Sequence, residues 1–131
     1  MLHAQSLYYP EMVDLSDLTQ KEKAGSTIIA SLYDETMILV LMATSPGYFA
    51  PTHMHPHEQI GMVLSGEAVL WIGGDEIIVR QGGFYSIPAN VPHNEVCIGD
   101  EPFVEMVFYP TGEDDYWLSE EKQECERANS Y

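Results

Sequence analysis

The chain has 131 residues, 45% hydrophobic and 20% charged, which fits one globular domain and excludes the disordered and fibrous classes. Its net charge of −16 argues against nucleic acid and anionic lipid as partners. No apolar run is long enough to span a membrane, and no secretory signal is visible. These features predict that the protein has no membrane partner. Cys97 and Cys125 are too few for a disulfide framework, so we also expect a cytoplasmic location.

Residues 1–24 read as an irregular lead-in with one helical turn around Asp14 to Leu18. A barrel follows over about residues 25–110, where Gly and Pro separate short runs rich in Ile, Val, Tyr and Phe. The Gly73-Gly74-Asp75 segment is a strong hairpin signal, because Gly supplies the positive φ of a tight turn. The predicted strands are 27–33, 36–44, 51–55, 59–64, 67–72, 76–80, 84–87, 93–98 and 103–109.

The run from Met37 to Met42 is apolar at every position, which predicts burial on both faces of its strand, plausible at a dimer interface. From Asp114 the sequence changes to good helix formers with acids in the first turn. A short C-terminal helix and tail are therefore predicted over about 114–131. The whole chain, 1–131, is predicted to form one all-β domain with this helix appended.

Four side chains in the barrel region are spaced for metal ligation. His53 and His55 lie two apart, so on a strand they point to the same face. Pro56 then breaks the strand, Gln59 begins the next one, and His93 follows Pro92 on a later strand. A lone His is more often a surface or core residue, but three imidazoles with an amide oxygen suit Zn, Ni, Mn or Fe. We predict a divalent transition-metal ion bound by His53, His55, Gln59 and His93.

The sequence resembles the cupins at two places. Gly47, His53-x-His55, Gln59 and Gly66 follow the spacing of the first cupin motif, and the segment from Gly82 through Pro88 to His93 resembles the second. The resemblance implies a small bacterial cupin with a double-stranded β-helix (jelly-roll) fold, a homodimer, and the metal in the barrel interior. Residues 55–67 and 87–93 are most similar to the pectin-degradation branch, which linearises unsaturated uronates.

Three positions depart from the family pattern. Gln59 stands where the first motif usually has Glu, Asn90 where the second usually has Gly, and Cys97 where the second closes on Asn. The Gln leaves the full charge of the ion in place, which favours polarisation of a carbonyl, hydroxyl or water. It also makes oxidation of the metal less favourable, so the departure argues against a dioxygenase.

The catalytic residues of the uronate branch are not matched. Its acidic position falls on Met106 and its arginine on Gly112, while its aromatic is retained as Phe108. If Phe108 faces the interior, strand alternation places Met106 there too and turns Glu105 outward. The substrate pocket is then predicted to include Phe108 and Met106, together with two tyrosines, Tyr48 and Tyr85, although strand packing is the simpler role for any one tyrosine.

Two main functions remain open from the sequence. The first is a metal-dependent, non-redox isomerisation, tautomerisation or lyase-type conversion of a small sugar-like substrate, with a neutral substrate favoured. The second is a non-catalytic ligand-binding or sensing cupin, which the lack of an evident general base favours. An Fe-dependent dioxygenase is a weaker third interpretation. The catalytic residues are not identified by the sequence.

Overall fold

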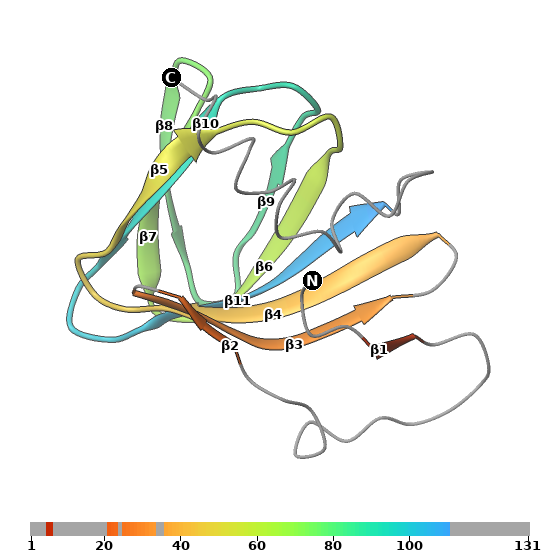
Figure 1. Ribbon diagram of the computed structural model, residues 1–131. Coiled ribbons are helices and arrows are strands. Elements are labelled where there is room, and N and C mark those ends of the chain that lie inside the picture. Colours follow the sequence, from red (N-terminus) through yellow and green to blue (C-terminus); the bar gives the residue numbers. More distant parts are fainter. Residues whose placement is uncertain (1–4, 7–20, 24, 34–35, 111–131) are drawn as a thin grey trace.

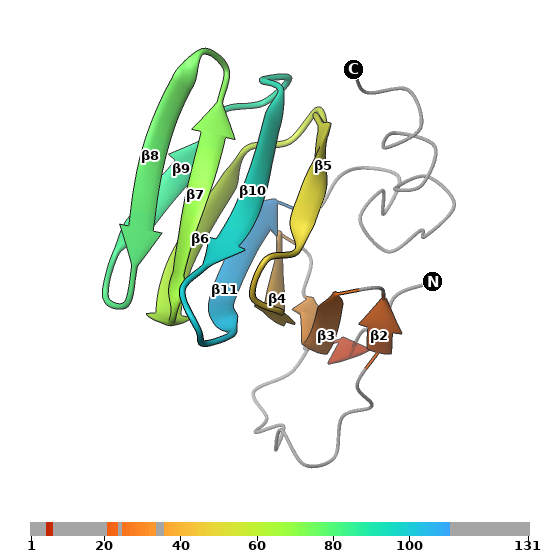
Figure 2. The same ribbon diagram turned by 90° about the vertical axis from the view of Figure 1, so that its left-hand side faces the viewer.

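The computed structural model describes residues 5–6, 21–23, 25–33 and 36–110, which form two facing β-sheets (Figure 1). The larger sheet has seven strands in the order β1-β3-β4-β11-β6-β9, with β2 paired to β3. The smaller sheet has four strands in the order β5-β10-β7-β8, and Figure 2 shows it in front of the strands β6, β9 and β11. Every pairing is antiparallel except β1 with β3. This all-β jelly roll is the fold class predicted from the sequence.

The nine strands expected in the barrel are all present, each with its ends within two residues of the prediction. The bounds are β3 Ser26–Tyr33, β4 Met37–Thr44, β5 Phe49–His53, β6 Gln59–Ser65, β7 Glu67–Ile72, β8 Asp75–Arg80, β9 Phe84–Ile87, β10 His93–Ile98 and β11 Phe103–Pro110. The lead-in was predicted to lack strands, and this is wrong at two short segments, β1 (Gln5–Ser6) and β2 (Lys21–Lys23). Both are added to β3, whose edge would otherwise carry unpaired backbone groups.

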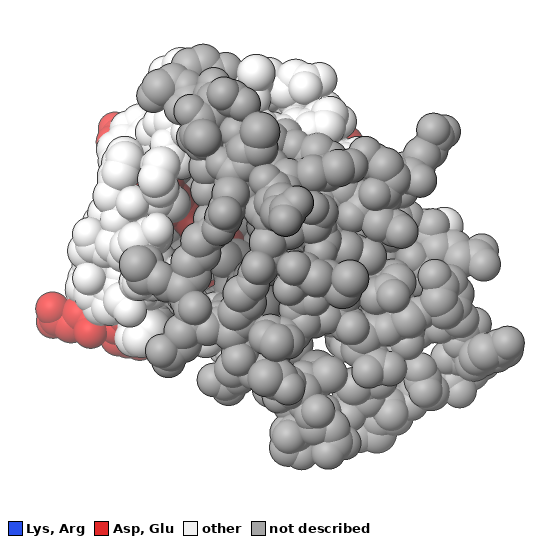
Figure 3. All heavy atoms as spheres, viewed as in Figure 1, with Lys and Arg blue, Asp and Glu red and all other residues white. Residues whose placement is uncertain are grey.

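Two sequence predictions fall outside the described residues. These are the helical turn around Asp14 to Leu18 and the C-terminal helix and tail over 114–131. Within the described residues there is no helix of the length and apolar character needed to cross a membrane. On the described part of the face in Figure 3 no Lys or Arg is visible, and acidic atoms are visible at its lower left edge and near the centre of the view.

The core lies between the two sheets and follows strand alternation. On β11 the residues Phe103, Glu105 and Val107 are buried, whereas the residues between them are only half-buried. Burying apolar side chains such as Phe103 and Val107 supplies about 25 cal/mol per Å² of stabilisation. The main cluster is Val63, Ala68, Leu70, Val79, Tyr85, Ile87, Cys97 and Phe103. Cys97 is a buried free thiol.

The outer face of the larger sheet is also apolar. In register, Phe108 of β11 pairs with Leu39 of β4 on one side and with Ile60 of β6 on the other. Met62 of β6 pairs in turn with Phe84 of β9, which is 67% exposed. The two-sided apolar character that the sequence shows at Met37 to Met42 therefore continues across four strands of this sheet.

The loop before β10 links the two sequence motifs. Asn90 has φ of 60°, a left-handed conformation that Asn tolerates better than other side-chain-bearing residues, and its backbone N–H donates to the carbonyl oxygen of His55 at 2.8 Å. Among the described residues it is the one non-glycine with positive φ. The replacement of the family's usual Gly by Asn is thus compatible with the backbone, and the turn holds His55 against the start of β10.

Candidate metal centre and its cavity

Three imidazoles converge at one end of the barrel. His53 is the last residue of β5, His93 is the first of β10, and the two are paired in register across these strands. His55 lies two residues beyond β5, in the loop that Asn90 holds, so its position comes from the loop and not from strand alternation. One ring nitrogen from each of the three histidines lies within 4.8 Å of the others.

Each imidazole is oriented by a backbone carbonyl two residues away. The Nδ1 atoms of His53, His55 and His93 lie 2.9, 2.8 and 2.9 Å from the carbonyl oxygens of Pro51, His57 and Val91. A carbonyl oxygen only accepts, so Nδ1 carries the hydrogen in each ring and Nε2 is left with its lone pair. This is the tautomer that a neutral His needs to ligate a metal through Nε2.

Burial keeps two of the rings neutral. Desolvation, followed by repulsion from His93, lowers the pKa of His55 to about 4. Desolvation likewise lowers the pKa of His93. The Nε2 of His93 is buried and has no hydrogen-bond partner among the described residues. A buried nitrogen without a partner costs free energy, which a metal ion at this point would recover. The three residues therefore fit a transition-metal ion.

The predicted fourth ligand, Gln59, is the first residue of β6 and is buried beside the histidines. Its Nε2 donates to the Tyr85 hydroxyl at 3.0 Å. With its nitrogen directed to Tyr85, the amide has its oxygen left for the histidine side. All four predicted ligands thus lie at one site.

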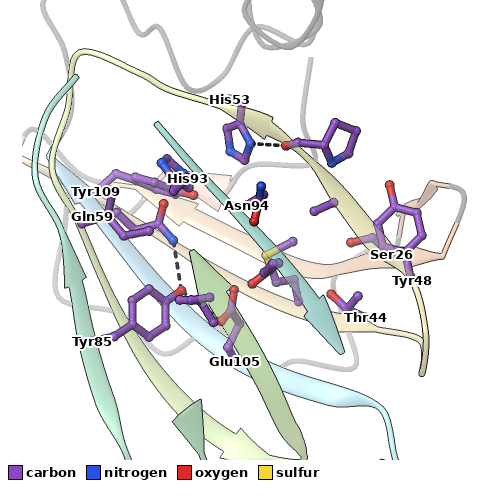
Figure 4. Close-up of a pocket in the computed structure, with 16 residues that line it drawn as sticks. Ser26, Thr44, Tyr48, His53, Gln59, Tyr85, His93, Asn94, Glu105 and Tyr109 are labelled. Carbon is purple, nitrogen blue, oxygen red and sulfur yellow. Dashed lines mark hydrogen bonds between the residues drawn. The ribbon is translucent and has the colours of Figure 1, made fainter. Parts of the chain in front are cut away.

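A cavity between the sheets extends from the histidines to an acidic end (Figure 4). Figure 4 shows His53, His93, Gln59 and Tyr109 at one end, with Tyr85 and Glu105 below them. No Lys or Arg is among the described residues that line it. The lining residues are Ser26, Met42, Thr44, Tyr48, Ala50, Pro51, His53, Gln59, Leu70, Tyr85, Ile87, His93, Asn94, Glu95, Glu105 and Tyr109.

Two carboxyl groups form the acidic end. Glu105 is 2% exposed and accepts a hydrogen bond of 2.9 Å from the Tyr85 hydroxyl. Burial, and then repulsion from Glu95, raises the pKa of Glu105 well above its usual range. Burial also raises the pKa of Glu95 to about 7, and it raises the pKa of Tyr85. At neutral pH this pair can retain a proton, which makes it able to donate or accept one.

The predicted substrate residues divide into two groups. Tyr48 and Tyr85 line the cavity, while Met106 and Phe108 lie on the outer face of β11. The inward parity assigned to Phe108 is wrong, because Phe103 and Val107 are fully buried and fix the alternation of the strand. The same alternation turns Glu105 into the cavity, where the sequence argument placed it outside. The pairing of β11 with β6 shifts register after Val104, but the alternation of burial is unbroken.

The sequence reasoning missed Glu95 and placed Glu105 on the outer face, whereas both line the cavity. A signal was present, because each glutamate interrupts a run of strand residues, and a charged residue that is buried in a strand is a candidate for a functional site. Counting parity from the apolar Phe103 would have placed Glu105 inside. Gly112, at the family's arginine position, lies outside the described residues.

Comparison with known proteins agrees with this architecture. A family model described as "Cupin domain" matches residues 40–109, which is more than half of the chain. Among curated proteins, no significant match is found.

Three solved structures illustrate the likeness in fold. An RmlC-like cupin from Shewanella frigidimarina is 19% identical with a TM-score of 0.66, covering 75% of this chain and 87% of its own. KdgF from a Halomonas species is 21% identical with a TM-score of 0.64, covering 76% and 92%. The DMSP lyase DddQ from Ruegeria pomeroyi is 25% identical with a TM-score of 0.56, covering 63% and 41%.

Proposed function

Since the chain belongs to the cupin family, we propose that it is an enzyme that converts a small, neutral, sugar-like substrate with the help of a divalent transition-metal ion. His53, His55, His93 and Gln59 would hold the ion. The reaction would be a non-redox isomerisation, tautomerisation or lyase-type step. When bound, such an ion acts as a Lewis acid that polarises a carbonyl or hydroxyl oxygen.

One observation carries this proposal: His53 and His93, two of the three clustered histidines, line the same cavity as the Glu105 carboxyl. The sequence alone offered no general base, and that lack favoured a binding or sensing protein. Glu105 supplies one, since burial raises its pKa and the Tyr85 hydroxyl lies within hydrogen-bond distance of it. A carboxyl tuned in this way contributes typically 10²- to 10⁴-fold to proton-transfer reactions.

The charges around the cavity favour a neutral substrate. Glu95 and Glu105 line it, and the described residues bring no Lys or Arg to it. A uronate carboxylate would lack the Arg or Lys partner that usually binds such a group. Asn94, Tyr48 and Tyr109 offer hydrogen-bonding groups to hydroxyls, while Met42, Leu70 and Ile87 provide apolar contacts. This combination suits a neutral sugar or a related polyol more than an acid.

Metal content and turnover test the proposal together. Protein purified without added metal is analysed for Zn, Ni, Mn and Fe, then offered a panel of neutral ketoses, aldoses and unsaturated uronates, with products followed by NMR. We expect conversion of a neutral sugar without oxygen, and its loss in His55→Ala and Glu105→Gln. Glu76→Gln makes the same chemical change at an exposed position of β8 and is the matched control.

Other results would select the alternatives. Conversion that requires oxygen and Fe would favour a dioxygenase and contradict the non-redox proposal. Tight binding of a ligand without turnover would favour a sensing cupin. Turnover of uronates in preference to neutral sugars would contradict the substrate class but not the metal chemistry. Cytoplasmic location stays a prediction from the sequence.

We also propose that two copies pair through the outer face of the larger sheet. The outward residues of β4, β11, β6 and β9 carry no charge, although the chain as a whole carries −16. Exposed Ile60 and Phe84 lie on this face, and contiguous apolar patches of this kind mark interaction sites. Light scattering should give a dimer mass that Phe84→Glu halves. Ile78→Glu, on exposed β8, should leave it unchanged.

A further inference from the structure

Gln59, Tyr85 and Glu105 form one chain of hydrogen bonds from the histidine end of the cavity to its acidic end. The Gln59 Nε2 lies 3.0 Å from the Tyr85 hydroxyl, and that hydroxyl lies 2.9 Å from Glu105 Oε2. All three side chains are buried, so the bonds are shielded from bulk solvent. The residues come from β6, β9 and β11, which are neighbours in the larger sheet in the order β11-β6-β9.

The direction of the chain is set by its members. Tyr85 gives its single hydroxyl hydrogen to Glu105 Oε2, an oxygen that can accept whether or not the other oxygen of the carboxyl carries a proton. The hydroxyl can then only accept from position 59, and an amide NH₂ can donate there, whereas a carboxylate cannot. The Gln59 nitrogen is thereby committed to Tyr85, which leaves its oxygen as the atom available on the histidine side.

The sheet is shaped to hold Tyr85 in this place. Gly61 is its direct partner in register, and a Cβ at Gly61 would overlap the Tyr85 ring. The glycine therefore provides the space in which the ring lies. The space left by Gly61 is an observation independent of the hydrogen bonds. It indicates that the position of the Tyr85 ring is determined by the packing of the sheet.

We propose that Tyr85 and Glu105 are positioning residues that fix the Gln59 amide with its oxygen toward the metal, and that position 59 is Gln because Glu105 already supplies the carboxylate of this chain. The inference rests on the metal site proposed above. The departure from the family's usual Glu is then explained, because the carboxyl group missing at position 59 is present at position 105, on the far side of the Tyr85 hydroxyl.

Co²⁺ binding to the metal-free protein tests the positioning role without any substrate. Wild type should bind Co²⁺ and give visible d–d absorption bands. Tyr85→Phe keeps the ring but frees the amide, and outer-shell changes of this kind typically cost 10- to 100-fold in metal affinity. We expect a loss of that size with altered bands, while Tyr48→Phe, a matched change in the same cavity, leaves both within twofold.

A reciprocal exchange tests the pairing itself. In Gln59→Glu two carboxylates, at positions 59 and 105, lie beside the Tyr85 hydroxyl, which has only one hydrogen to donate. We therefore expect the Tm of the metal-free protein at pH 8 to fall by about 5 °C. Adding Glu105→Gln reverses the chain of hydrogen bonds. The new amide at position 105 then donates to the Tyr85 hydroxyl, and that hydroxyl donates to the new carboxylate at position 59. The double variant should therefore have a higher Tm than the summed shifts of Gln59→Glu and Glu105→Gln give.

The outcomes separate the two proposals. No Co²⁺ binding by wild type would overturn the metal site. Binding by wild type that Tyr85→Phe leaves unchanged in affinity and spectrum would overturn the positioning role alone. If Tyr85→Phe does not fold, the exchange decides: a Tm shift in the double variant equal to the sum of the shifts of Gln59→Glu and Glu105→Gln would overturn the pairing, and a Tm above that sum would support it.

Discussion

The two ends of the cavity are built in different ways. At the histidine end, His53, His55 and His93 are each oriented by a carbonyl two residues away in sequence. At the acidic end, Tyr85 and Glu105 hold one another through side chains from β9 and β11, which are not adjacent strands. The rings of the first end are oriented by local geometry, whereas the hydrogen bond of the second forms only when β9 and β11 both have their places in the larger sheet.

The same burial acts on both ends with opposite sign. Desolvation lowers the pKa of His55 and His93 and raises that of Glu95 and Glu105, so both groups are pushed toward their neutral forms. Neutral imidazoles are ready to ligate a metal, and a carboxyl that retains its proton is ready to exchange it. Burial in the same cavity therefore prepares one end to bind a metal ion and the other end to exchange a proton.

Breaking the histidine end should have the largest effect. His55→Ala removes one of three converging imidazoles, and since outer-shell changes already cost about 10- to 100-fold in metal affinity, we expect a loss beyond 100-fold together with loss of turnover. Isothermal titration with Zn²⁺ measures the affinity. His57→Ala is the matched control, because its backbone carbonyl, which His55 uses, remains. Equal affinities for wild type and His55→Ala would place the metal elsewhere.

Breaking the acidic end should affect turnover and leave the metal in place. Glu105→Gln keeps the size of the side chain and an oxygen that can accept from Tyr85, but it cannot exchange a proton. We expect kcat to fall by about 10²- to 10⁴-fold, while affinity for Zn²⁺ changes by less than tenfold. Steady-state kinetics on the substrate found in the panel gives the first value. A kcat equal to that of wild type would remove Glu105 from the chemistry.

The sequence predicted the two ends unequally for the same reason that they are built differently. His53-x-His55, Gln59 and His93 have a recognisable spacing because the ligands lie at strand ends and in short loops. The strands were also well placed, since Gly and Pro mark their ends. His55 was assigned to a strand and lies beyond it, because the loop held by Asn90, not the pleat, determines where that ring points.

Glu105 could not be found from a motif, because its partner Tyr85 is twenty residues away and no fixed spacing links them. The parity argument failed because it took Phe108 as the inward anchor, when Phe103 and Val107 are the fully buried residues. Burying a carboxyl is costly, so sequence reasoning places it outside by default. Here the Tyr85 hydrogen bond and a raised pKa offset that cost, and neither is visible without the fold.

The contact between Gly61 and Tyr85 offers a way to disturb the acidic end without changing any polar group. Gly61→Ala places a methyl group where the Tyr85 ring lies, and overpacking of this kind typically costs 1–3 kcal/mol. We expect that loss in urea unfolding, with Co²⁺ affinity reduced because the ring can no longer hold Gln59. Gly74→Ala, where an added Cβ meets nothing within 4 Å, is the control. Unchanged stability in Gly61→Ala would mean that the ring is not confined.

The smallest effect concerns the stability of the metal-free protein. Below about pH 4.5, the ordinary carboxyl pKa, Glu105 is protonated in both the folded and unfolded chain. As the pH rises, the unfolded chain releases its proton first, because burial raises the folded pKa, so the wild type loses stability with increasing pH. Glu105→Gln removes this loss. Its advantage over wild type should therefore grow from near zero at pH 4.5 to the order of 1 kcal/mol at pH 8, the size typical of single substitutions. Chemical unfolding in EDTA, with Glu76→Gln as control, measures the difference, and an advantage that shrinks with rising pH would show that Glu105 is ionised and stabilised in the fold.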